Sequence, residues 1–390
     1  MEGLRTYQLG ELLSIPIRNG LTKPSSIRGK GVKMIGMGEL FSNDIIRAID
    51  MPRVPVTDTE LRTASIEKGD LLFARQSLVL EGAGKCSIVK EIDSPTVFES
   101  HLIRCRINSS LALPEYIYYY FKSREGRHNI ESIVEQVAAA GIRGRDLVKL
   151  SITIPSIEVQ RRIVDILLSF DEKIEINNRI NHNLEEQAQA LFKSWFVDFE
   201  PFKDGEFVDS EFGYIPNGWR LGKLSELVEV RYGKDHKFLK DGRIPVYGSG
   251  GLMRYADRAL FESESVLIPR KGTLSNVMYV DHPFWTVDTM FYTIGKIEHV
   301  IKYAHLFLLT QDLASMNAGS AVPSMTTDIL NKLPVLIPTY EVLRDFDAIV
   351  SALYLIIGRD RAENASLASS RDSILPKLMS GAIDFNTLNC

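Results

Sequence analysis

Two pairs of polar side chains occupy corresponding places in the chain and could read the edges of DNA bases. Arg75 and Gln76 follow one short apolar run, and Arg270 and Lys271 follow another that looks like its counterpart. Arginine, lysine and glutamine can form paired hydrogen bonds with bases in the major groove. Each residue could also be an ordinary surface residue, so the prediction of base contact concerns the set.

Further cations cluster in segments that read as loops. Arg143 and Arg145, which lie beside glycines, are a third candidate pair for base contact. The other cations form two runs that suit phosphate contacts, which anchor a protein without specifying sequence. A solvated basic face is the simpler explanation of either run. The first run comprises Arg18, Lys23, Arg28, Lys30 and Lys33, and the second comprises Arg231, Lys234, Lys237, Lys240 and Arg243.

No set of residues predicts catalysis or a metal site. The Asn-Pro-Pro-Tyr and Asp-Pro-Pro-Tyr motifs of adenine methylation are absent. Residues 82–85 (GAGK) resemble the end of a phosphate-binding loop, but Val79 replaces the leading glycine and Cys86 replaces serine or threonine. His101 and Cys105 lack a second pair of ligands at metal-binding spacing. We therefore predict no catalytic residue and no metal ligand in this chain.

Residues 155–199 show a long helical pattern, and this helix must position the binding residues of the globular parts. It contains no proline or glycine after residue 155, and stepping by four and three from Ile163 to Trp195 gives eight apolar residues in ten. A 3.5-residue repeat is typical of a coiled-coil seam. The predicted core residues are Ile163, Leu167, Phe170, Ile174, Leu184, Leu191 and Trp195.

The same pattern returns 183 positions later, after Pro338, with seven apolar residues in ten. At 1.5 Å per residue the first seam is about 50 Å long. A domain of about 120 residues spans only roughly 35 Å, so it could not easily carry the chain back for parallel pairing. We therefore predict an antiparallel coiled coil. Its second set of core residues is Phe346, Val350, Leu353, Ile357, Leu367, Ile374 and Leu378.

Polar residues interrupt the centre of both seams, at Asn177 and Asn181 in the first and at Asp360 and Asn364 in the second. In an antiparallel pair the centres face each other, so these four side chains could form one layer that fixes the register. The alternative is that the helices splay there or leave these residues exposed. The sequence favours neither explanation.

The globular segments repeat as well, because RLGKLSELVEVRYG at residues 220–233 echoes LGELLSIPIRNG at residues 9–20. Repetition of a domain and a helix indicates an internal duplication with an approximate two-fold relation. The predicted fold class is α+β, with two mixed α/β domains, two long helices in an antiparallel coiled coil, and a circular internal repeat. The predicted parts are domain one (1–150), helix one (151–200), a linker (201–218), domain two (219–332) and helix two (333–390).

Composition limits the class of protein only broadly. The net charge of −4 and the pI near 6.1 give no global argument for nucleic acid. Three cysteines, Cys86, Cys105 and Cys390, suit a reducing cytoplasm better than a secreted scaffold. The sequence contains neither an N-terminal signal nor an apolar run long enough to cross a bilayer. The expected location is the cytoplasm.

The order of these segments resembles the specificity subunits of type I restriction-modification systems, and the resemblance covers the whole chain. It departs from the family pattern at Leu343 and Tyr354, which stand where Gln160 and Asp171 would recur. These departures leave open whether the two helices present equivalent docking surfaces. The resemblance rests on Pro155, Glu158, Gln160, Ile163, Leu167, Asp171 and Ile174, and on AQALFKSWFVDF (188–199), GYIPNGWRLGKLSE (213–226) and AGSAVPSMTTDILNKLPVLIP (318–338).

The resemblance implies a DNA-reading adaptor without catalytic activity of its own. Each domain would recognise half of a bipartite, asymmetric target in double-stranded DNA, and the helices would act as spacer and docking site. Two methyltransferase (modification) subunits would dock there, joined by restriction (translocase and nuclease) subunits. S-adenosylmethionine, ATP and magnesium would belong to these partners. Candidate docking residues on the outer face of helix one are Glu158, Gln160, Arg161 and Asp171.

Two other classes of function remain open from the residues alone. The chain could be a catalytic methyltransferase or nuclease, although the motifs described above are missing. It could also be a coiled-coil scaffold for proteins with no role in DNA binding. Sequence-dependent DNA binding by the reconstituted complex would separate the adaptor from the scaffold.

Overall fold

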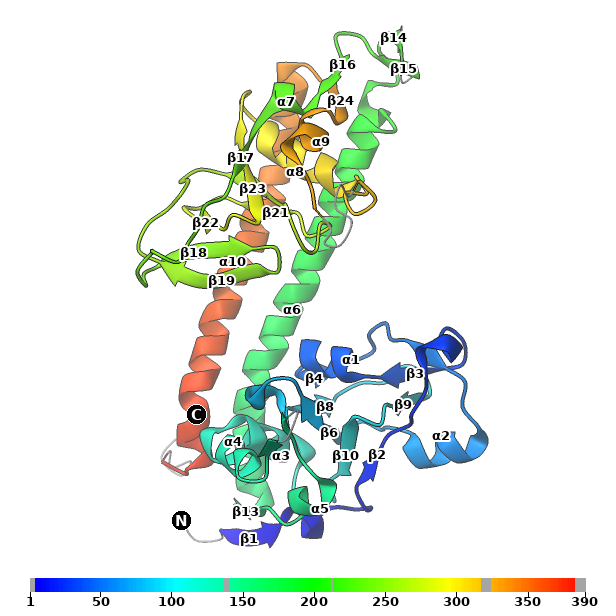
Figure 1. The fold of residues 1–390 in the computed structure, drawn as a ribbon, viewed down its shortest axis with the longest axis vertical. Coiled ribbons are helices and arrows are strands. Elements are labelled where there is room, and N and C mark those ends of the chain that lie inside the picture. The colour runs from blue at the N-terminus through cyan, green and yellow to red at the C-terminus, as the bar shows by residue number, and fades with distance from the viewer. Residues whose placement is uncertain (1–3, 137–139, 212, 317–323, 383–390) are drawn as a thin grey trace. The chain divides into compact units, whose positions relative to one another are not determined.

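The computed structural model describes residues 4–136, 140–211, 213–316 and 324–382, and the chain divides into two compact units (Figure 1). Unit 1 comprises residues 1–175 and 364–390, and unit 2 comprises residues 176–363. Each unit contains one mixed α/β domain and one half of each of two long helices, α6 (Ile157–Phe196) and α10 (Tyr340–Met379). Cys390 and residues 318–323, which entered the sequence predictions, lie outside the described residues.

The two long helices pair within each unit and run antiparallel. In unit 2, Glu185 of α6 pairs with Arg361 of α10 at 2.8 Å, and the rings of Trp195 and Phe346 lie 5.6 Å apart. Because the residue number rises along α6 while that of its partner on α10 falls, the pair is antiparallel. In unit 1, Asp171 of α6 forms an ion pair with Arg371 of α10. None of the twenty seam positions of the two 3.5-residue repeats is exposed. The predicted fold class is confirmed.

The polar residues at the centre of the seams are buried. Asn177, Asn181 and Asp360 are 1%, 6% and 3% exposed, so the alternative that these three lie open to water is wrong. Asn177 donates a hydrogen bond to Glu363 at 2.7 Å. A single layer that also includes Asn364, which belongs to the other unit, stays a prediction.

The domain of unit 1 is built around a five-stranded sheet with the order β2-β10-β6-β8-β4. The predicted strands at residues 70–73, 86–89 and 101–107 correspond to β6, β8 and β10, and the predicted helix at residues 114–122 is α3. The strands are β1 (Arg5–Gln8), β2 (Arg18–Asn19), β3 (Val32–Ile35), β4 (Ile45–Ile46), β5 (Arg53–Val54), β6 (Asp70–Ala74), β7 (Gln76–Ser77), β8 (Cys86–Val89), β9 (Thr96–Phe98), β10 (Leu102–Arg106), β11 (Glu135–Gln136), β12 (Ala140–Gly141) and β13 (Ser151–Ile154). The helices are α1 (Met37–Ser42), α2 (Asp58–Ala64), α3 (Pro114–Lys122), α4 (Arg124–Glu131) and α5 (Gly144–Leu147), with short 3-10 turns at Leu9–Leu12, Ser25–Ile27 and Leu80–Gly82.

The domain of unit 2 contains a four-stranded sheet with the order β17-β23-β20-β21 and a three-stranded sheet with the order β19-β18-β22. The segment predicted as a linker holds a 3-10 turn, Glu200–Phe202, and the hairpin formed by β14 (Phe207–Ser210) and β15 (Gly213–Pro216). The other strands are β16 (Arg220–Lys223), β17 (Val228–Tyr232), β18 (Ile244–Gly248), β19 (Gly251–Ala256), β20 (Ser265–Pro269), β21 (Met278–Val280), β22 (Trp285–Thr286), β23 (Met290–Gly295) and β24 (Pro334–Ile337). The helices are α7 (Leu224–Leu227), α8 (Val300–Leu309) and α9 (Thr327–Asn331).

The internal duplication extends to the strands of the two domains. The antiparallel order β2-β10-β6-β8 in unit 1 corresponds to β17-β23-β20-β21 in unit 2. The first and last strands of each domain also pair antiparallel, β1 with β13 and β16 with β24, directly before a long helix begins. Each domain is therefore closed by its own ends, and its core extends onto the long helices within its unit.

Candidate nucleic-acid interface

Three of the predicted base-contacting residues of unit 1, Arg75, Gln76 and Arg143, come together where β2 and β6 of the main sheet end and β10 begins. The Arg75 N–H donates to the His101 carbonyl at 2.8 Å, which places the end of β6 beside the start of β10. The chain returns to this place much later: the Ile142 N–H donates to the Arg75 carbonyl at 2.9 Å, and Gly141 pairs with Gln76. Arg143, predicted separately, therefore lies next to the segment that carries Arg75 and Gln76. We call Asn19, Gly20, Arg75, Gln76, His101 and residues 141–143 the first strand edge.

Unit 2 repeats this arrangement with different side chains. The Arg270 N–H donates to the Thr289 carbonyl at 2.8 Å, and the Met325 N–H donates to the Arg270 carbonyl at 2.8 Å. Lys271 forms a β-bridge with Ser324, as Gln76 pairs with Gly141 in unit 1. The sequence-based match of Arg75 with Arg270 is therefore a structural equivalence. Tyr232, Gly233, Arg270, Lys271, Thr289, Ser324 and Met325 form the second strand edge.

A glycine at each strand edge allows backbones to approach closely. A Cβ atom added to Gly20 would lie 2.0 Å from the Phe98 carbonyl oxygen, and one added to Gly233 would lie 2.1 Å from that of Val287. No side chain fits at either position. The glycines belong to matching triplets, Arg18-Asn19-Gly20 and Arg231-Tyr232-Gly233. This Arg-x-Gly repeat is a sequence signal that could have marked both edges.

The side chains at the edges differ in how firmly they are held. Arg270 is half-buried, with its guanidinium 5.3 Å from the centre of the Tyr232 ring and a 3.1 Å hydrogen bond to the Asp288 carbonyl. Gln76 and Lys271 are exposed, and Arg143 is exposed beside its ion-pair partner Glu135. The two strand edges therefore present cations, an amide and an arginine stacked on an aromatic ring. Such groups bind base edges and phosphates.

The basic run of unit 1 is only partly available to a ligand. Lys23 has 13% of its side chain exposed and contacts Glu60 at 2.9 Å, and Lys33 is 8% exposed and contacts Asp93 at 2.8 Å. Phosphate contact is therefore the wrong assignment for both lysines, because carboxylates of the domain already hold their charges. Arg28 is exposed and lies 3.9 Å from Glu99. Arg18 on β2, Lys30, and Arg145 beside Asp146 are exposed and stay predictions.

The basic run of unit 2 is exposed throughout. Arg231 on β17 occupies the place that Arg18 occupies on β2, and its guanidinium hydrogen-bonds to Glu229 at 3.0 Å, which raises the pKa of Arg231. Lys234, Lys237, Lys240 and Arg243 are also exposed and stay predictions.

Two of the four predicted docking residues on α6 are internal. Gln160 is fully buried: its side-chain oxygen accepts from the Leu113 N–H, and its side-chain nitrogen donates to the Pro155 carbonyl, both at 2.9 Å. Asp171 is 8% exposed, accepts a 2.6 Å hydrogen bond from the Tyr119 hydroxyl and pairs with Arg371. Neither residue can dock a partner from the outer face. Both instead hold the domain of unit 1 on the helix, through α3 and the residue that precedes it.

The remaining two docking candidates, Glu158 and Arg161, are exposed near the start of α6. Their role in docking stays a prediction.

The second repeat replaces these polar contacts at the same positions. Leu343, the counterpart of Gln160, is buried in the apolar core of unit 2. Tyr354, the counterpart of Asp171, hydrogen-bonds through its hydroxyl to the ring of His305 on α8 at 2.6 Å. Burial lowers the pKa of His305 to about 4, so this ring is neutral at pH 7. The departures from the family pattern therefore mark a different way of joining a domain to its helix.

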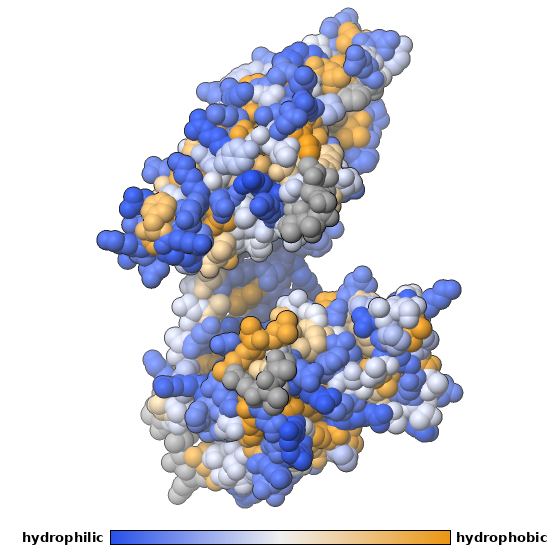
Figure 2. Space-filling model, in the orientation of Figure 1, coloured by the Kyte–Doolittle hydropathy of each residue, from blue (hydrophilic) through white to orange (hydrophobic). Residues whose placement is uncertain are grey.

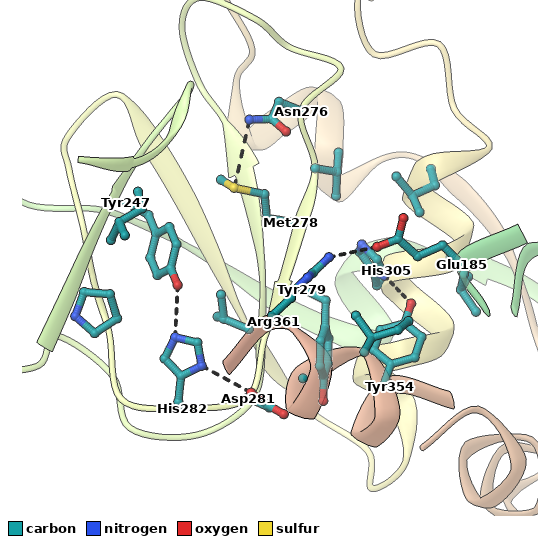
Figure 3. Close-up of a pocket in the computed structure, with 18 of the residues that line it drawn as sticks. Glu185, Tyr247, Asn276, Met278, Tyr279, Asp281, His282, His305, Tyr354 and Arg361 are labelled. Atoms are coloured by element: carbon teal, nitrogen blue, oxygen red, sulfur yellow. Dashed lines mark hydrogen bonds and ion pairs between the residues drawn. The ribbon is translucent and has the colours of Figure 1, made fainter. Parts of the chain in front are cut away.

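A cavity of about 760 Å³ in unit 2 lies between the β18–β19 hairpin, β21, α8 and the long helices (Figure 3). Its polar groups pair with one another: the Tyr247 hydroxyl lies 3.0 Å from His282, which lies 3.2 Å from Asp281. Burial raises the pKa of Tyr247, which opposes formation of a nucleophilic tyrosinate. The cavity is therefore better explained as a space beside the helices than as a catalytic centre.

Within the described part of the chain, no group of three or more His, Cys, Asp and Glu residues is placed to bind a metal ion. Cys86 and Cys105 are buried free thiols, and burial raises the pKa of both. Among the described helices, none combines the length and apolar character that would carry it across a membrane.

Comparison with known proteins agrees with the order of segments in the chain. The family model described as "Type I restriction modification DNA specificity domain" matches residues 1–186 and 216–351. The MjaIX specificity subunit of Methanocaldococcus jannaschii is 28% identical over 298 residues, which cover 69% of each chain. The HindI specificity subunit of Haemophilus influenzae is 24% identical over 444 residues, which cover 90% of this chain and 94% of the relative.

A solved structure shows the same fold. The crystal structure of a type I restriction-modification S subunit from M. genitalium has a TM-score of 0.57 at 16% identity, with 96% of each chain covered. The family match spans both domains, most of α6 and the start of α10, and it confirms the resemblance seen in the sequence. The chain belongs to the type I restriction-modification DNA specificity family.

Proposed function

We propose that this chain is the DNA-reading subunit of a type I restriction-modification complex, and that each domain reads one half of a bipartite, asymmetric target. The observation that supports this most is the repeated strand edge. Both domains present a central arginine, Arg75 or Arg270, with a neighbouring polar residue at the end of the same strand. Because the backbone is repeated and the side chains differ, the two domains would read different bases.

The long helices would separate the two readers and dock two methyltransferase subunits, which restriction subunits would join. Leu355 and Ile349 on α10 are 74% and 45% exposed, which suits a protein contact. Their counterparts on α6 are Glu172, which lies 3.7 Å from Lys90, and the half-buried Ile166. The two docking surfaces would therefore differ in polarity.

Catalysis would reside in the partners, which would carry S-adenosylmethionine, ATP and magnesium. The proposed division of labour is supported by the family and by the absence of recognised catalytic motifs in the sequence. Methylation by the purified chain alone with S-adenosylmethionine would contradict it.

The proposal is tested by the binding of DNA to the complex of this chain with the modification subunits of its own system. We expect preference for a bipartite target over a scrambled duplex of equal composition, at both about 50 mM and about 200 mM salt. Binding to the scrambled duplex should fall by orders of magnitude between these salt concentrations, since phosphate contacts dominate it. Binding without sequence preference at both concentrations would instead favour a protein scaffold.

A further inference from the structure

An exposed apolar tip follows the first strand edge directly. Leu78, Val79 and Leu80 are 97%, 59% and 42% exposed. Figure 2 shows a largely hydrophilic surface on which hydrophobic residues form limited patches. Three consecutive exposed apolar side chains are unfavourable in water, and they indicate a surface that becomes covered.

The tip is held in place by its own hydrogen bonds. Ser77 pairs with Ala140 on β12, and its side-chain oxygen accepts from the Val79 N–H at 3.2 Å. Arg127 on α4 donates to the Leu80 carbonyl at 3.4 Å and to the Ala83 carbonyl at 3.2 Å. The loop therefore presents Leu78 in a set position, and little ordering is needed when a ligand covers it.

The place of Leu78 in the chain identifies the ligand that would cover it. Gln76 and Leu78 are both exposed, and Leu78 directly follows the end of β7. Because the two residues are two positions apart, their Cα atoms lie within about 7 Å of each other. A duplex that brings a base edge to the Gln76 amide therefore also brings a neighbouring base within reach of Leu78, and the proposed ligand of Gln76 is the edge of a base in the major groove.

The apolar group in the major groove is the C5 methyl of thymine. We propose that Leu78 reads a thymine methyl beside the base contacted by Gln76, and this inference rests on the proposed function. The second strand edge lacks an equivalent tip. There Lys271 is followed by Gly272, which has a φ of 88°, by the exposed Thr273, and by Leu274, which is 3% exposed. The methyl contact would therefore occur in one half-site only.

Replacement of thymine by uracil tests this inference, because it removes one methyl group from the DNA. The specific duplex is bound by the complex with modification subunits, and each thymine is replaced in turn. We expect one thymine in one half-site to lose about fourfold in affinity on conversion to uracil, from the loss of one buried methyl group. Leu78→Ala should bind the thymine and uracil duplexes equally, and its thermal unfolding should match the wild type because Leu78 makes little contact with the fold.

The matched control is Leu4→Ala, which truncates an exposed leucine directly before β1, outside both strand edges and the proposed docking surface. It should keep the full difference between thymine and uracil. The inference is overturned if no thymine of the target loses affinity on conversion to uracil, or if Leu78→Ala still binds the thymine duplex more tightly than the uracil duplex. It is also overturned if Leu78→Ala weakens binding of the modification subunits in the absence of DNA, because Leu78 would then contact protein. If the wild-type complex shows no sequence preference, the proposed function itself has failed.

Discussion

Replacing Arg75 with alanine should relax recognition of one half-site, and replacing Arg270 should relax recognition of the other. Each arginine directly follows an inner strand of the main sheet of its domain, β6 or β20, and backbone hydrogen bonds to other segments of the same domain hold it there. An arginine that pairs with a base contributes about 1–3 kcal/mol of discrimination between bases. Arg270 should show the larger effect, because its contacts with Tyr232 and the Asp288 carbonyl orient the guanidinium before DNA arrives.

The measurement is the affinity of the complex for a series of duplexes, each with base changes in one half-site. Each alanine variant should lose discrimination in a different half-site and keep it in the other. Lys203→Ala, which removes an exposed cation of the 201–218 segment, is the control for loss of charge and should keep discrimination in both. Equal weakening of all duplexes by Arg75→Ala would show that Arg75 contacts phosphate and does not read a base.

The ion pair between Asp171 and Arg371 should have the largest effect on stability. Burial by itself lowers the pKa of Arg371, but the hydrogen bond and charge of Asp171 outweigh it and raise the pKa. Arg371→Met would leave a carboxylate that is 8% exposed with the Tyr119 hydroxyl as its remaining hydrogen-bond donor in the described residues. Breaking a buried pair on one side costs about 3–5 kcal/mol. Urea denaturation of the intact chain should show this loss in the transition of unit 1.

Combining Arg371→Met with Asp171→Asn should restore most of that stability, because the asparagine is neutral and still accepts from Tyr119. The second repeat supports this expectation. At the equivalent positions Tyr354 and Ala188 are packed with apolar residues and no ion pair is needed. Arg361→Met is the control, since its pair with Glu185 is 61% and 44% exposed and should contribute about 0–1 kcal/mol. Equal losses in Arg361→Met and Arg371→Met would contradict the special role of the buried pair.

The fold was largely predictable because two periodic signals carried it. The 3.5-residue spacing of apolar residues located both helices, and the 183-residue offset linked each seam position to its partner in the other repeat. The match between Arg75 and Arg270 followed from the same repetition and holds in the structure. These features depend on the local sequence and on the similarity between the two repeats, and both can be read from a single sequence.

Features that depend on contacts between distant segments were missed. A polar residue on a long helix is normally exposed, so nothing in the local pattern showed that Gln160 and Asp171 are buried by Leu113 and Tyr119. The ion pair that neutralises Lys23 joins residues 37 positions apart. The tip at Leu78 resembles an ordinary strand in sequence, and its exposure becomes evident only when β7 is seen to end at Ser77.

Methylation-site mapping after a domain exchange tests the central claim most directly. Residues 1–146 would be replaced by the corresponding domain of a relative with a different target, and methylated sites would be mapped in DNA from cells that make the whole complex. We predict that one half-site changes to that of the donor, while the other half-site and the spacing between them stay as in the parent. A change in both half-sites, or in neither, would contradict the assignment of one half-site to each domain.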